Sequence, residues 1–318
     1  MKNNPHKAMI LTVTPNPCVD KTVFIDALTP GAKIRSRKFT CIPGGKGTNV
    51  SRAVKALGGE TVAMVIVGGH TGRHVVEMIE TQDGVRCAPV WVKGMTRTIT
   101  TVLEEPVHRQ TALFEPGPEL SAEEKESVVA AFRYAARDAR VTTFNGASSC
   151  PMTHDLYATL IPIARDAGAL TVLDSYGPDF ALALDAVPYM VKPNREEAEQ
   201  AVGFALDSDA ACRRAMDIFH EKGVRLVVLS LGAEGAIISR AGERLRAIPP
   251  KIREVNPVGS GDALVAAFAI GLMEGWPLEQ MAQMGVAAGA ANACSWDIGH
   301  FTREEVHAVA QRVYIKAF

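Results

Sequence analysis

The stretch Asn256-Pro257-Val258-Gly259-Ser260-Gly261-Asp262-Ala263 leads directly into an apolar run at residues 264–273, which predicts a helix. The two glycines before this helix allow the backbone to turn sharply and to expose its N–H groups. The positive end of the helix dipole adds to those groups, so the loop is typical of an anion-binding site. We therefore expect the amides of Gly259, Ser260 and Gly261 to hold a phosphate or a similar anion.

Asp262 is an unusual residue at the mouth of an anion site, because a carboxylate repels phosphate. Its position makes sense if Asp262 is a general base that takes the proton from a hydroxyl attacking the phosphate. The alternative is that Asp262 only caps the helix, since aspartate is favoured there. The motif by itself leaves both interpretations open.

A second glycine-rich motif, Pro43-Gly44-Gly45-Lys46-Gly47-Thr48-Asn49, precedes a helix predicted at residues 49–57. It is not a Walker A loop, because Lys46 is followed by glycine and the glycine spacing is too short. It still offers free backbone amides, one ammonium and one carboxamide at a helix N-terminus. Such a set suits sugar hydroxyls and a phosphate, with a simple glycine-rich turn as the alternative.

Short apolar runs alternate with amphipathic segments through most of the chain. Continuous apolar strands of this kind indicate a parallel sheet that is covered on both faces. The sequence therefore predicts an α/β fold with a doubly wound, mostly parallel sheet, forming a single domain over residues 1–318. The expected strands are 9–14, 62–67, 141–144, 170–173, 189–191 and 226–229, and the expected helices include 49–57, 123–137 and 210–221.

Two segments, about 19–43 and 86–116, break this alternation, because β-branched residues alternate there without a helix between successive strands. We expect both to form antiparallel ribbons that make a small β lid over one edge of the main sheet. A pair of hairpins without a function is the alternative. Because the ribbons would leave unpaired strand edges and an apolar face, we also expect a homodimer joined through the lid.

The amino-acid composition limits the kinds of molecule that this protein is expected to bind. Hydrophobic residues make up 47% of the 318 residues, charged residues make up 22%, and the net charge is −1. This balance gives no general attraction to nucleic acid or to an anionic membrane, so neither is an expected partner. No run approaches the roughly 20 apolar residues of a membrane span. The six scattered cysteines contain no CxxC pair, which favours free thiols and a cytoplasmic location.

The two glycine motifs together carry a family resemblance. Residues 44–49 (GGKG-x-N) and 259–262 (GSGD), in this order, resemble the two signatures of the PfkB, or ribokinase-like, carbohydrate kinases. Further matches are TPNP at 14–17 with Asp20, KPNREE at 192–197 and SLGAEG at 230–235. Within the family, the chain is most similar to the 1-phosphofructokinase and tagatose-6-phosphate kinase branch.

The resemblance implies a reaction and its participants. The γ-phosphoryl group of ATP would pass to a primary hydroxyl of a ketohexose phosphate, namely fructose 1-phosphate, tagatose 6-phosphate or fructose 6-phosphate. The implied partners are thus ATP and a small phosphosugar, with Mg²⁺ as the cofactor of ATP and K⁺ as a further candidate. Asp262 would be the base, and the amides of Gly259, Ser260 and Gly261 would stabilise the transferring group.

The resemblance also implies which residues bind the sugar and which bind magnesium and ATP. The sugar hydroxyls would be held by Asp20, Gly44, Gly45 and Asn49, and the phosphate of the sugar by Lys33, Lys46 and Arg97. Lys192, Asn194 and Glu197 would organise magnesium and the ATP phosphates, and the ATP cleft would be lined by Ser230, Gly232, Gly235 and Asn292.

The spacing of Asn194 and Glu197 supports a metal site independently. These residues are three apart after a strand, so both lie on one face of the first helical turn. Magnesium prefers oxygen ligands and retains water, so one carboxylate acting partly through water suffices. A helix-capping pair is the alternative. Asp174, a carboxylate directly after another strand, either touches phosphate-bound magnesium or caps a turn.

Two other functions remain in competition. A kinase of an unphosphorylated sugar or a nucleoside would have no substrate phosphate for Lys33, Lys46 and Arg97 to neutralise. A non-catalytic sugar-phosphate sensor would have no use for Asp262. Two departures from the family bear on specificity: residues 145–151 (NGASSCP) replace a Ser-Gly-Ser-Leu-Pro-Pro-Gly loop near the sugar, and 295–299 (SWDIG) replace a turn of small residues near the nucleotide and monovalent-cation region.

Overall fold

A ten-stranded sheet forms the centre of the molecule, which is a computed structural model describing residues 9–318. Seven strands run parallel, and three strands from the C-terminal half extend one edge in antiparallel pairing. The order across the sheet is β14 (Tyr314–Ala317), β13 (Glu243–Ile248), β12 (Ala236–Arg240), β11 (Leu226–Ser230), β10 (Met190–Val191), β9 (Leu170–Asp174), β8 (Ala139–Asn145), β1 (Met9–Thr14), β4 (Thr61–Val67) and β5 (Arg86–Trp91).

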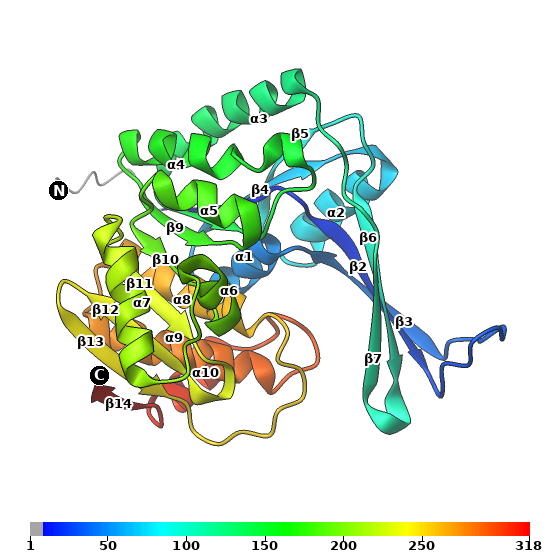
Figure 1. The fold of residues 1–318 in the computed structure, drawn as a ribbon. Helices are drawn as coiled ribbons and strands as arrows, with labels where there is room; N and C mark the ends of the chain where they lie inside the picture. The colour runs from blue at the N-terminus through cyan, green and yellow to red at the C-terminus, as the bar shows by residue number, and fades with distance from the viewer. Residues whose placement is uncertain (1–8) are drawn as a thin grey trace.

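Helices cover both faces of this sheet, as the apolar runs predict (Figure 1). In β1, Leu11 and Val13 pack into one core, whereas Ile10 packs into the core on the opposite face. The first face carries α3 (Ala122–Ala135), α4 (Leu156–Asp166), α5 (Gly177–Asp185), α6 (Arg195–Val202) and α7 (Asp209–Glu221). The second carries α1 (Lys46–Ala56), α2 (Gly69–Thr81), α8 (Ser260–Glu274), α9 (Leu278–Ala293) and α10 (Arg303–Ala310). The doubly wound α/β prediction is confirmed.

A separate four-stranded sheet extends from one side of the main body as a lid (Figure 1). Its order is β3 (Lys38–Gly44), β2 (Cys18–Ile25), β6 (Arg97–Glu104) and β7 (Arg109–Phe114). Each outer pair is an antiparallel hairpin, but the central strands β2 and β6 pair in parallel. Parallel pairing arises because β2 and β6 come from hairpins that both leave the main sheet in the same direction.

The second lid segment begins later than the sequence predicts. Residues 86–91 form β5, which pairs in parallel with β4 and belongs to the main sheet. The lid part therefore starts at Arg97. The turn after α2 returns the chain to the sheet before it enters the lid, and the pattern of β-branched residues does not distinguish these two strands.

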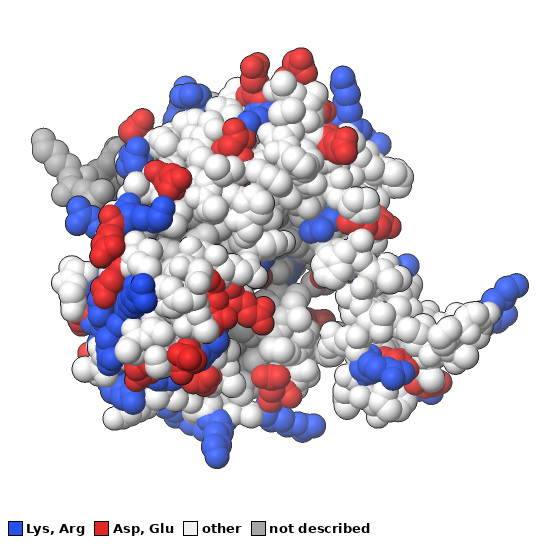
Figure 2. Space-filling model, in the orientation of Figure 1, with Lys and Arg blue, Asp and Glu red and all other residues white. Residues whose placement is uncertain are grey.

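On the face of the molecule drawn in Figure 2, basic and acidic side chains are not gathered into separate patches. Figure 2 shows Lys and Arg interspersed with Asp and Glu, and a hollow between the main body and the lid. Within residues 9–318, every helix is too short or too polar to cross a bilayer.

Candidate active site

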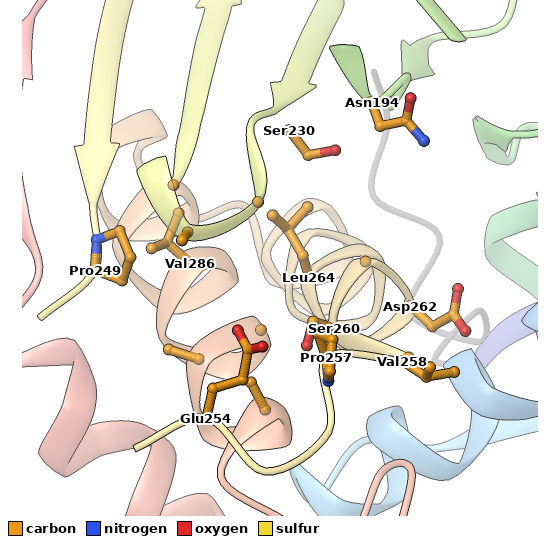
Figure 3. A pocket seen from close by; sticks show the side chains of 18 of the residues that line it. Asn194, Ser230, Pro249, Glu254, Pro257, Val258, Ser260, Asp262, Leu264 and Val286 are labelled. Atoms are coloured by element: carbon orange, nitrogen blue, oxygen red, sulfur yellow. The ribbon is translucent and has the colours of Figure 1, made fainter. Parts of the chain in front are cut away.

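A cavity of about 760 Å³ lies at the carboxyl ends of the parallel strands, where both glycine motifs meet (Figure 3). In doubly wound sheets this edge is the usual place for ligands. In Figure 3, Asp262 and Asn194 lie toward one end of the cavity, and Pro249 and Val286 lie toward the other. The cavity brings together eleven of the predicted site residues: Lys46, Asn49, Lys192, Asn194, Ser230, Gly232, Gly235, Gly259, Ser260, Gly261 and Asp262.

The anion loop enters α8 through a backbone conformation that needs glycine. Gly259 has φ +82° and is the N-cap of α8, and a Cβ at this position would lie 2.3 Å from the Ile298 side chain. Asn256 fixes the loop by accepting from the amide of Val258 at 3.2 Å. Gly259, Ser260 and Gly261 line the cavity at the N-terminus of α8, which is the positive end of the helix dipole.

Asn292 supports this loop from behind. It is buried, and its Nδ2 donates to the carbonyl of Val258 at 2.8 Å and to Ser260 Oγ at 3.2 Å. Its Oδ1 accepts from the amide of Gly299 at 2.8 Å. These contacts use the whole carboxamide, and Asn292 is not among the residues that line the cavity. Its neighbours on α9, including Ala290 and Ala293, line the cavity in its place.

Asp262 lies buried in the first turn of α8 and receives a hydrogen bond from Asn49, Nδ2 to Oδ2 at 2.8 Å. Burial raises the pKa of the Asp262 carboxyl to about 7, and the negative charge of Asp174 acts in the same direction. Lys46, the Asn49 hydrogen bond and Lys192 oppose this rise. A carboxyl with this pKa can accept a proton at neutral pH and release it again, as a general base must.

Two lysines and a buried carboxylate form a charged cluster beside Asp262. Asp174 Oδ1 lies 3.2 Å from Lys192 Nζ and 3.4 Å from Lys46 Nζ. Burial alone would raise the pKa of Asp174, but Lys192 and Lys46 outweigh burial and lower it. Burial would lower the pKa of Lys46, but the carboxylates of Asp174, Asp262 and Glu197 raise it. The sequence patterns assign no definite role to Asp174. Its only signal in the sequence is that a carboxylate directly follows a predicted strand.

Asn194 and Glu197 form the helix-capping pair that the sequence offers as an alternative to a metal site. Glu197 N donates to Asn194 Oδ1 at 2.8 Å, and Asn194 N donates to Glu197 Oε2 at 2.9 Å. The other oxygen, Glu197 Oε1, lies 3.7 Å from Lys46 Nζ. Within residues 9–318 there is no group of three His, Cys, Asp or Glu side chains arranged around a metal.

The base of the lid supplies the predicted sugar-binding residues next to the cavity. Gly44 of β3 pairs with Cys18 of β2, and Asp20 lies two residues further along β2, opposite Ile42. A Cβ at Gly44 would lie 2.8 Å from the Asp20 Cβ, so only glycine fits beside Asp20. Burial raises the pKa of Asp20, and Arg52 opposes the rise. Gly45 caps α1 with φ +114°. Arg97 Nη2 donates to the carbonyl of Asn16 at 3.2 Å, and its buried Nε has no partner.

Lys33 lies away from the other predicted residues. It is exposed in the loop that connects β2 and β3 at the far end of the lid. Lys46 belongs to the cluster at the sheet edge, and Arg97 lies at the base of the lid. The structure therefore does not bring Lys33, Lys46 and Arg97 together within one chain, because the β2–β3 hairpin extends outward before it reaches the loop that carries Lys33.

The features in this cleft are those expected of a phosphotransferase: a glycine-rich loop at a helix N-terminus, a buried carboxylate at its mouth and lysines beside it. The sequence profile of the pfkB family carbohydrate kinases matches residues 13–297, and the chain belongs to that family.

Individual relatives agree with this assignment over nearly their whole length. The chain is 33% identical over 313 residues to a 1-phosphofructokinase of Xanthomonas campestris, covering 96% of this chain and 98% of that protein. It is 30% identical over 312 residues to a tagatose-6-phosphate kinase of Staphylococcus epidermidis, covering 96% and 99%. The tetrameric inhibited form of phosphofructokinase-2 from Escherichia coli has the same fold, with a TM-score of 0.89 at 28% identity over 96% of this chain and 99% of that one.

Proposed function

We propose that this protein transfers the γ-phosphoryl group of ATP to a primary hydroxyl of a ketohexose phosphate. The observation that carries the proposal is the buried carboxylate of Asp262, which lies at the mouth of the anion loop and is held by Asn49 from the sugar-binding motif. Asp262 does not cap α8, because Gly259 is the N-cap of that helix and no side chain makes a capping hydrogen bond there.

The chain's own residues account for the steps of transfer. The substrate hydroxyl loses its proton to Asp262 as its oxygen forms a bond to the γ-phosphorus, and the bond from that phosphorus to the ADP oxygen breaks. Asp262 later returns the proton to solvent. The amides of Gly259, Ser260 and Gly261 hold the charge on the transferring group, and Lys192 and Lys46 add positive charge beside it.

Magnesium fits the polar side of the cavity. When bound with ATP, it neutralises the charge of the phosphates. Glu197 Oε1 is not used by the capping pair, and Asp174 Oδ2 is a buried oxygen without a hydrogen-bond partner. We propose that Glu197, with Asn194 through water, holds the ion. A requirement for K⁺ is a further proposal, which rests on the family resemblance.

The apolar end of the cavity suits the adenine ring. Pro249 and Val286 lie there, and Gly232 and Gly235 after β11 also line the cavity. On the sugar side, Arg97 is proposed to bind the substrate phosphate, because it is a cation with a buried, unpartnered Nε. A guanidinium matches the geometry of phosphate well.

Assembly and location are parts of the same proposal. Phe39, Leu113 and Phe114 of the lid are each at least 60% exposed, which supports a homodimer that covers the lid. We propose a cytoplasmic location, since all six cysteines are free.

An ADP-release assay tests the function directly. Fructose 1-phosphate, fructose 6-phosphate and tagatose 6-phosphate are compared with fructose and a nucleoside at equal concentration. We expect turnover with at least one of the three phosphosugars. Turnover with the unphosphorylated compounds alone would replace the phosphosugar proposal, and binding of a phosphosugar without ADP release would identify a sensor.

A further inference from the structure

The guanidinium of Arg52 connects four segments that meet beside the proposed base. Arg52 follows Asn49 by three residues on α1, and its side chain is 12% exposed. Its Nη1 donates to Asn49 Oδ1 at 3.1 Å and to the carbonyl of Ile298 at 3.3 Å. Its Nε donates to Asp83 Oδ1 at 2.7 Å, and its Nη2 donates to the carbonyl of Pro43 at 2.7 Å. All three guanidinium nitrogens are therefore engaged.

The contact with Asn49 fixes the direction of its carboxamide. An amide oxygen only accepts hydrogen bonds, and an amide NH₂ only donates them. Because Arg52 donates to Oδ1, the Nδ2 faces Asp262 and donates to its carboxylate. A reversed amide would place oxygen against the carboxylate and NH₂ against the guanidinium, and both pairings are repulsive. Arg52 thus selects the one orientation in which Asn49 stabilises the ionised base.

Arg52 is itself held by groups outside α1. Asp83, in the turn after α2, is 7% exposed and pairs with Nε. Pro43 lies in lid strand β3, directly before Gly44. Ile298 lies in the connection between α9 and α10. A lysine ammonium could not reach these acceptors together, because its donors radiate from a single nitrogen.

From this network we propose that Arg52 is a positioning residue for phosphoryl transfer, which orients the Asn49 carboxamide toward Asp262 and fixes the end of lid strand β3 relative to the base. The inference rests on the proposed function only in taking Asp262 as the base. The charged groups that face Asp262 are Lys46 of α1, Asp174 of β9 and Lys192 after β10. The substitution Arg52→Lys leaves all three in place, so its effect on Asp262 passes through Asn49.

Arg52→Lys is the first test, because it keeps a cation beside Asp83. We expect kcat to fall about tenfold and the KM for ATP to change less than about twofold, since a contact to a charged group is weakened on the sugar side alone. We expect the acid limb of the kcat/KM profile to move up by about 0.5 to 1 pH unit, because the ionised base loses a donor. Lower stability with an unchanged kcat and acid limb would overturn the proposal.

Asp83→Asn is the matched control. It keeps an oxygen acceptor for Arg52 Nε and does not touch the contact between Arg52 and Asn49. We expect a lower melting temperature with the acid limb at its wild-type position. If Asp83→Asn shifted the acid limb of the kcat/KM profile as far as Arg52→Lys does, the role of Arg52 would be only to stabilise the structure. If Arg52→Lys does not fold, the double variant R52Q/D83N removes both buried charges and allows the same measurements.

A titration without turnover separates this inference from the proposed function. The infrared carboxyl band that disappears in Asp262→Asn reports the ionisation of Asp262 directly. We expect that band to titrate at higher pH in Arg52→Lys than in the wild type. An identical titration in a folded variant would overturn the positioning role. If the wild-type protein did not transfer a phosphoryl group, the proposed function would be refuted. The infrared titration would still show whether Arg52 affects the ionisation of Asp262.

Discussion

Asn49 Nδ2 donates a 2.8 Å hydrogen bond to Asp262 Oδ2, and this contact joins two helix N-termini that lie 213 residues apart in the chain. One helix follows the sugar-binding motif, and the other follows the anion loop. The proposed base is thus held by the same residue that is proposed to contact the sugar. In the proposed mechanism, proton transfer and substrate positioning therefore depend on one contact.

The variant Asp262→Asn separates a role of Asp262 in the chemistry from a purely structural role. Asparagine has the size of aspartate and loses only the negative charge in the first turn of α8, so we expect unfolding free energy to change by about 0.3 to 1 kcal/mol. It cannot accept the hydroxyl proton, so kcat should fall at least about a hundredfold while both substrates still bind. Steady-state kinetics and a melting curve measure both quantities. Near-normal turnover in the folded variant would contradict the mechanism.

The pH dependence of the wild-type reaction follows from the raised pKa of Asp262. The carboxyl must be ionised to act as a base, and its pKa is about 7. We expect kcat/KM for the sugar phosphate to rise as pH increases through about 7, and to fall tenfold per pH unit well below it. The profile is measured at saturating ATP and Mg²⁺. An acid limb near pH 4, the ordinary range of an aspartate, would show that the carboxyl is not perturbed by burial.

Arg97→Ala and Lys46→Ala distinguish the two sides of the cleft. Arg97 lies at the base of the lid, so its loss should raise the KM for the sugar phosphate about tenfold to a thousandfold and leave the KM for ATP nearly unchanged. Lys46 contacts Asp174 and Glu197, so its loss should affect the KM of both substrates. If the two variants changed the KM for ATP equally, this assignment of Arg97 and Lys46 to different sides of the cleft would be wrong.

Asp174→Asn tests the charged cluster. Lys192 is 4% exposed and lies 3.2 Å from Asp174, so this substitution leaves a buried ammonium without its partner. We expect a loss of about 3 to 5 kcal/mol in unfolding free energy, measured by denaturant titration. The double variant D174N/K192M removes both charges and should recover much of that loss. A single variant as stable as the wild type would show that Lys46 and Lys192 need no counter-charge.

The proposed homodimer through the lid is tested by the molecular mass of the protein in solution. We expect light scattering to show a homodimer at micromolar concentration, and Phe114→Glu to shift the protein toward the monomer, because Phe114 is 66% exposed on the outer strand of the lid. Exchange of Tyr134, which is 74% exposed on α3 outside the lid, for Glu serves as the control and should leave the dimer intact. A wild-type monomer would contradict the proposed assembly.

Local patterns were enough to predict most of the fold. The strands at residues 9–14 and 226–229 are visible as apolar runs, and the structure forms them as β1 (Met9–Thr14) and β11 (Leu226–Ser230). The anion loop was predictable for a similar reason, since Gly259 occupies a conformation that favours glycine and so leaves a signal in the sequence. Strand β5 was misplaced in the lid, because a short alternating segment does not record which strand it pairs with.

What the sequence by itself determined is therefore the class of fold, the two glycine-rich turns and the identity of Asp262 as a candidate base, because each depends on neighbours along the chain. Only the tertiary structure decided the rest. It placed Asp174 between two lysines and Lys33 at the far end of the lid. It also brought Arg52 into contact with Asp83 and with the carbonyl of Ile298. These relations depend on the packing of distant segments, and a carboxylate or a guanidinium in the sequence does not specify its partner.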